Sequence, residues 1–118
     1  MAAEERDATV FNLERLAESA GGDQELMRDL VTLYLQDTKQ KLVLLEDAVA
    51  SGRAQHSGTI AHGIKGASAA VGAEEAAQAF RALEHLGRDG DQVNLGNALH
   101  EARVAFERAR DQLRPMAA

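Results

Sequence analysis

The sequence contains no cysteine and no tryptophan, and its single proline, Pro115, lies close to the end. Without cysteine the chain has no disulfide, no thiol nucleophile and no cysteine-rich zinc site, which agrees with a reducing cytoplasm. Aromatic residues make up only 3% of the chain, and Ala, Leu, Glu, Arg and Gln dominate it. Because these residues favour helices and proline interrupts them, the composition predicts an all-α protein.

Long apolar runs and basic clusters are also missing. No stretch approaches the roughly 18 apolar residues of a membrane helix, and the acidic start, MAAEERDATV, lacks the features of a signal peptide. The net charge of −6 and the absence of a basic stripe argue against a nucleic-acid partner. We therefore expect a cytoplasmic monomer that binds neither membranes nor nucleic acid. A chain of 118 residues has room for one domain, which we place at residues 7–114, with flexible termini at 1–6 and 115–118.

Glycines and polar turns divide the chain into five predicted helices. These span Asp7–Ala20, Gln24–Ala50, Ala54–Val71, Glu74–Leu86 and Gln92–Leu113. Connections this short force consecutive helices to run antiparallel. The four long helices therefore predict an antiparallel up-down four-helix bundle, and the short N-terminal helix would cover one end of it.

The third predicted helix carries a histidine opposite its apolar stripe. At about 100° per residue, the residues that fall in one narrow stripe are Ile60, Ile64, Ala67 and Val71. This stripe must face the core of the bundle. His62 lies about 200° from Ile60 and should therefore point outward.

Small residues share the face of His62. Gly58, Gly66 and Ala69 lie on it together with Lys65. An interior glycine destabilises a helix by about 1 kcal/mol relative to alanine. Two explanations stay open at this point: tertiary packing absorbs the loss, or a partner's backbone must approach His62 closely. The second explanation makes Gly58, Gly66 and Ala69 a docking surface.

A carboxylate on the fourth helix is a candidate partner of the histidine. In a hairpin about Gly72, facing residues have numbers that sum to roughly 145, so that His62 faces Glu84, with Arg81 further toward solvent. Glu84 would lie at the edge of the core stripe, where its carboxylate could accept a hydrogen bond from Nδ1–H of His62. Nε2 would then point outward as a nucleophile. For an arbitrary His/Glu pair, a solvated surface glutamate is the favoured alternative.

The segment AHGIKGASAAVGA, residues 61–73, resembles the histidine phosphotransfer (HPt) domain family. That family has the pattern Ala-His-x-Leu-Lys-Gly, followed by small residues and Gly-Ala, and here Ile64 replaces the leucine. The resemblance extends upstream into GGDQELMRDLVTLYLQDT and downstream into Leu83-Glu84 and the turn GRDGD. It covers the chain from about Phe11 to about Arg110.

This resemblance implies a covalent phosphoryl carrier rather than an enzyme, without kinase activity of its own. His62 would exchange a phosphoryl group with the aspartate of response-regulator receiver domains, or receive it from a sensor histidine kinase. Lys65, with Arg81, would neutralise the phosphoryl charge, Glu84 would hydrogen-bond the imidazole, and Gly66 would let the receiver domain approach. No cofactor is intrinsic: the chain has no phosphate-binding loop, so Mg²⁺ would come from the partner receiver domain.

Two other functions fit the same residues less well. An adaptor would keep the docking surface without transferring a phosphoryl group, but the presence of His62 itself argues for phosphoryl transfer. A metal-binding four-helix bundle needs inward Glu-x-x-His pairs, and no such pair is found, so we assign no metal ligand. The remaining histidines are predicted to be structural or solvated: His56 on the core side of its helix, His85 and His100 in solvent. The Met1 start suits either a free-standing protein or an excised domain of a larger kinase.

Overall fold

The computed structural model describes residues 8–117, and the regular elements of this part of the chain are all helices, with no strand. The predicted all-α class is confirmed. The helices are α2 (Leu13–Ser19), α3 (Gln24–Ala50), α4 (Ala54–Ala70), α5 (Glu74–Arg88), α6 (Gln92–Leu113) and a short 3₁₀ helix, η1 (Arg114–Met116). The predicted bounds of α3 and α6 are correct, whereas α4 ends one residue earlier and α5 two residues later than predicted.

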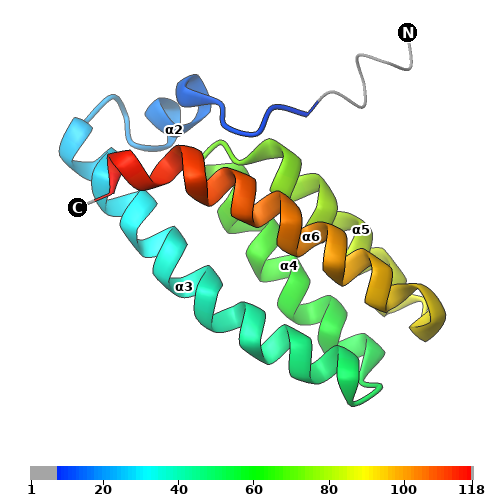
Figure 1. Ribbon diagram of the computed structural model, residues 1–118. Coiled ribbons are helices and arrows are strands. Elements are labelled where there is room, and N and C mark those ends of the chain that lie inside the picture. The colour runs from blue at the N-terminus through cyan, green and yellow to red at the C-terminus, as the bar shows by residue number, and fades with distance from the viewer. Residues whose placement is uncertain (1–7, 118) are drawn as a thin grey trace, which may run out of the picture.

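The four long helices lie side by side, and each packs against two of the others (Figure 1). Connections at residues 51–53, 71–73 and 89–91 join them, and the chain reverses its direction at each one. The central residue of every connection is a glycine with positive φ, a conformation that glycine adopts without steric cost. At Gly72 a side chain is excluded on two grounds, because φ is +83° and a Cβ would lie 2.2 Å from the carbonyl oxygen of Asn12.

The core forms where the apolar stripes of the long helices meet. Its largest fully buried apolar side chains are Leu16, Val31, Leu45, Ile64, Phe80, Leu83, Leu95 and Leu113. The Tyr34 ring packs edge-on against Phe106, with a centroid distance of 5.8 Å. Its hydroxyl lies 2.7 Å from the hydroxyl oxygen of Ser68, and burial raises the pKa of Tyr34 to about 12. The buried hydroxyl of Tyr34 therefore has a hydrogen-bond partner in Ser68.

The buried face of α4 is rotated from the predicted one. Ser57, Ala61, Ile64 and Ser68 are buried, whereas Ile60 is only half-buried. Most residues of this face are small: Ser68 pairs with Tyr34 of α3, and Gly58 lies against the backbone of α5. His56 is exposed, so its predicted place on the core side was wrong, while His85 and His100 are exposed as predicted.

The first helix begins later than predicted. The predicted start at Asp7 lies outside the described residues, and α2 begins at Leu13, where the side chain of Asn12 caps it by accepting from the N–H of Arg15. The backbone N–H of Asn12 donates to the carbonyl of Gly72 at 2.8 Å. Because this segment is bonded to the α4–α5 connection, it does not continue the helix upstream.

The predicted flexible ends fall partly outside the described residues. Residues 1–6 and 118 are not described, whereas Arg114–Met116 form η1 and Met116 packs against the core. No helix within residues 8–117 is long and apolar enough to cross a membrane.

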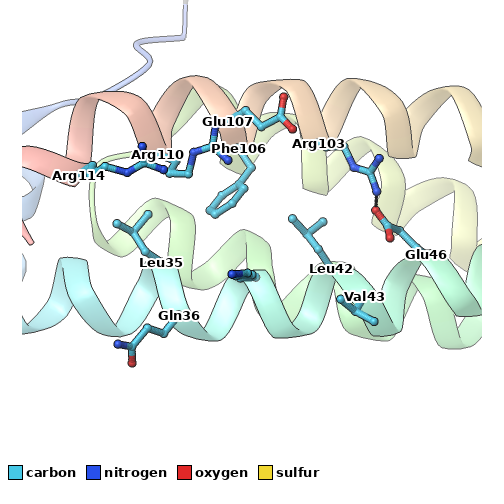
Figure 2. A pocket seen from close by; sticks show the side chains of 11 residues that line it. Leu35, Gln36, Leu42, Val43, Glu46, Arg103, Phe106, Glu107, Arg110 and Arg114 are labelled. Carbon is cyan, nitrogen blue, oxygen red and sulfur yellow. Dashed lines mark ion pairs between the residues drawn. The ribbon is translucent and has the colours of Figure 1, made fainter.

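A pocket of about 410 Å³ lies between α3 and α6. Figure 2 shows the Phe106 ring pointing into the space between Leu35 and Leu42, and Arg103 reaching across to form an ion pair with Glu46. None of the residues that line it surrounds His62. The surroundings of the histidine are built instead by α4 and α5.

Two glycines let α4 and α5 contact each other through backbone atoms. A Cβ on Gly87 would lie 2.6 Å from the carbonyl oxygen of Ala54 and 2.7 Å from the amide nitrogen of Gly58. A Cβ on Gly58 would lie 3.1 Å from the carbonyl oxygen of Glu84. Gly58 is buried in this contact. Its missing side chain therefore serves the packing of the two helices. Gly58 also lines a small pocket beside His62, and its predicted role in docking a partner stays a prediction.

Replacing Gly87 with alanine tests this close contact. The obstructing atoms are backbone atoms, so the helices must separate, and we expect Gly87→Ala to lower the free energy of unfolding by about 1–3 kcal/mol. The matched control is Gly66→Ala, because Gly66 is exposed on α4 with nothing within 4 Å of an added Cβ. Alanine should raise helix stability there by up to about 1 kcal/mol. Urea unfolding of both variants measures the difference, and equal stabilities would contradict the packing.

Candidate functional site

His62 stands on the outer surface of α4, as predicted. Its side chain is 62% exposed. Gly66, one turn along the helix, leaves open space beside it, and Ala69 is half-buried. The imidazole therefore rises from a surface of small residues, where a second protein can approach it.

Glu84 lies beneath the imidazole and is more deeply buried than the predicted edge position. Its side chain is only 2% exposed, and its Oε2 lies 2.8 Å from Nδ1 of His62. Because an ionised carboxylate can only accept, Nδ1 must carry the proton in this hydrogen bond. Nε2 of the neutral ring then keeps its lone pair and is the nitrogen available for reaction.

Two cations share the same carboxylate. Nζ of Lys65 lies 2.9 Å from Oε1, and Nη2 of Arg88 pairs with Oε2. The Lys65 ammonium contributes most to lowering the pKa of Glu84 to about 2, burial opposes it, and His62 and Arg88 lower the pKa further. Glu84 is therefore a permanent anion beside the histidine at neutral pH.

Arg88 is the site residue that the sequence prediction missed. Ending the fourth helix at Leu86 left Arg88 in a turn, whereas α5 continues to Arg88. Arg88 follows Glu84 by four positions, a spacing that places two side chains on the same face of a helix. This spacing could have identified Arg88 as a partner of Glu84 from the sequence, but only if the predicted helix had been two residues longer.

Arg81 lies at the rim of the site and does not reach Glu84. It is exposed, and it has no ion pair within residues 8–117. A surface groove of about 460 Å³ runs along His62 and brings together residues of α4 and α5. Its lining residues are His62, Lys65, Gly66, Ala69, Ala77, Gln78, Arg81, Glu84, His85 and Arg88. Three cations thus border the histidine on a chain with a net charge of −6.

The arrangement offers a nucleophile and positive charge, and little else. Within residues 8–117, no three His, Asp or Glu side chains gather as metal ligands would. A metal-binding bundle therefore has no candidate ligand set in this part of the chain. What the geometry supports is attack by Nε2 on an electrophile that carries negative charge.

Glu84 should make the stability of the fold depend on pH. Its pKa is about 2 in the folded chain, against an ordinary value of 4.5. The folded state therefore favours the carboxylate, and the resulting stabilisation is complete above pH 4.5 and is lost as the pH falls toward 2. We expect the difference in free energy of unfolding between wild type and Glu84→Gln to shrink over this range. Urea unfolding at stepped pH measures it, and Glu101→Gln, which removes an exposed carboxylate of α6, is the control. A difference that stays constant with pH would contradict the low pKa.

Comparison with protein families gives one finding. A family model described as Hpt domain matches residues 29–114, which is more than half of the chain. The matched range includes α4, α5 and α6 entirely and most of α3, and so contains every residue of the site. Comparisons with curated proteins and with solved structures returned no match.

Proposed function

The chain belongs to the Hpt domain family, and on this premise we propose that it carries a phosphoryl group on Nε2 of His62. Domains of this family act in phosphotransfer during two-component signalling, as phosphocarrier modules rather than enzymes. The observation that supports His62 as the carrier is its exposed imidazole, whose Nδ1 is engaged by a buried carboxylate. An adaptor that only docks a partner would have no use for this orientation.

The proposed donor is the aspartyl phosphate of a response-regulator receiver domain. The Nε2 lone pair attacks phosphorus, an N–P bond forms, and the P–O bond to aspartate breaks as its carboxylate leaves with the bonding electrons. Nδ1 keeps its proton, so no base is needed. Transfer to a second receiver domain is the reverse of this step, and a sensor histidine kinase is the alternative donor.

Charge and position supply most of what this reaction needs, because phosphoryl transfer passes through a loose transition state. We assign Lys65, with Arg81 at the rim, to neutralise the phosphoryl oxygens. Glu84 holds the ring and balances the positive charge that the ring gains when Nε2 is phosphorylated. Because no candidate metal ligands gather within residues 8–117, Mg²⁺ would come with the receiver domain. Gly66 and Ala69 would form the surface on which that domain docks.

Four expectations from the sequence belong to the same proposal. We propose that the domain spans residues 7–114, that it acts as a monomer in the cytoplasm, and that α3–α6 form an antiparallel up-down bundle. The three-residue connections between long, contacting helices support the last of these.

Radiolabelled phosphoryl transfer tests the assignment of His62. Incubation with a phosphorylated receiver domain should label the wild-type chain with an acid-labile, base-stable phosphoryl group, and His62→Gln should remain unlabelled. The control His85→Gln, which removes another exposed histidine from the same groove, should keep the label. Binding of the receiver domain without any label would favour the adaptor, and label retained by His62→Gln would refute the assignment.

A bulky side chain at position 66 should obstruct docking. We expect Gly66→Gln to keep the fold and to slow transfer by about tenfold or more, equivalent to roughly 1.4 kcal/mol at the transition state. The matched control is Gly96→Gln on α6, where an added Cβ also meets nothing within 4 Å and which is not part of the groove. Stopped-flow or quenched-flow transfer rates distinguish the two, and a rate for Gly66→Gln equal to that of the control would overturn the docking assignment.

A further inference from the structure

The three partners of Glu84 are not equivalent. Oε2 accepts hydrogen bonds from Nδ1 of His62 and from Nη2 of Arg88. Oε1 faces Lys65 alone among the described residues, with Nζ 2.9 Å away. The Lys65 side chain is 29% exposed, against 62% for His62 and 66% for Arg88, so it is the least exposed of the three partners. If Lys65 moved, Oε1 would lose its only neighbouring cation, whereas Oε2 would keep both of its donors.

The proposed reaction places two demands on Lys65. In the free chain its ammonium neutralises Glu84, whereas during transfer it is needed at the phosphoryl oxygens on Nε2. The two positions are close, since His62 and Lys65 are three residues apart on one helix. However, Glu84 is almost fully buried, and removing the partner of a buried charge is strongly unfavourable. Lys65 can leave only if another cation stays with the carboxylate.

We propose that Arg88 is a positioning residue that holds Glu84 when Lys65 moves to the phosphoryl group on His62. This inference rests on the proposed function, because it needs a phosphoryl group at that nitrogen. Arg88 donates to Oε2, the same oxygen that accepts from His62, so the imidazole keeps its orientation throughout. Without Arg88, Glu84 retains Lys65, and the phosphoryl group loses its nearest cation.

The proposed role of Arg88 depends on its ion pair with Glu84 and not only on its positive charge in the groove. Arg81 lies on the same helix and lines the same groove, but it has no ion pair within residues 8–117. Arg81→Gln therefore removes the same charge without touching Glu84, which makes it the matched control for Arg88→Gln. Arg88→Lys keeps a cation four residues from Glu84 and should restore much of the function. Because the Arg88 side chain is 66% exposed, none of these variants leaves a cavity in the core.

The experiment is a double-mutant cycle on the rate of transfer from a phosphorylated receiver domain. Lys65→Gln should slow the wild type by about tenfold or more. In the Arg88→Gln background, where Lys65 is already retained by Glu84, the same change should slow transfer by less than about threefold. Arg81→Gln should leave the full effect of Lys65→Gln in place. If Lys65→Gln slowed transfer by the same factor in the Arg88→Gln background as in the wild type, the inference would be overturned. Arg88 would then act on the phosphoryl group or the receiver domain directly.

A spectroscopic measurement separates positioning from a loss of docking. Phosphoramidate can donate its phosphoryl group to Nε2, as the N–P bond to ammonia breaks, without any receiver domain. Nitrogen NMR of the Lys65 ammonium should show a large shift on phosphorylation in wild type and in Arg81→Gln, and little shift in Arg88→Gln. A shift that is the same in Arg88→Gln as in wild type would refute the inference. If neither receiver domain nor phosphoramidate labels the wild type, the proposed function fails and this inference fails with it, whereas a labelled wild type together with an equal effect of Lys65→Gln in both backgrounds refutes the inference alone.

Discussion

The carboxylate of Glu84 lies between two helices where water does not reach it, and a buried charge is costly unless other groups hold it. Three side chains meet that need here: His62, Lys65 and Arg88. The pairing fixes the ring of His62 as well as the carboxylate, because the shared hydrogen bond has only one donor and one acceptor. A requirement of folding and a requirement of reactivity are thus satisfied by the same contacts.

The backbone must bring the two helices close for this to happen. Gly58 and Gly87 allow α4 and α5 to approach until backbone atoms nearly touch, and any side chain at Gly87 would separate them. Glu84 lies three residues before Gly87 on the same helix, so separation there would also widen the gap to His62. The glycines of α4 consequently serve two purposes, since Gly58 faces α5 and Gly66 faces solvent.

Periodicity predicted most of this fold and part of the site. The apolar repeat gave the bounds of α3 and α6 correctly, and it placed His62 outside the core. The register of a short hairpin was enough to name Glu84. It could not reveal how deeply Glu84 is buried, because a helical wheel describes one helix and burial depends on how closely the next one packs. The same limit explains the burial of Gly58 and the exposure of His56. The buried face of α4 consists mainly of small residues, whereas a search for large apolar residues centred the predicted face on Ile60.

Helix ends were the other weak point, and one of them concerned function. Glycine and aspartate after Leu86 indicate a turn, yet the α-helix continues for two residues, and the ion pair between Arg88 and Glu84 stabilises that last turn. A cation near the C-terminus of a helix is also favoured by the helix dipole. Extending the helix thus adds local stability and at the same time completes the set of charges around the histidine. In a domain whose chemistry consists of one nucleophile and the charge around it, a difference of two residues at a helix end decides which groups belong to the site.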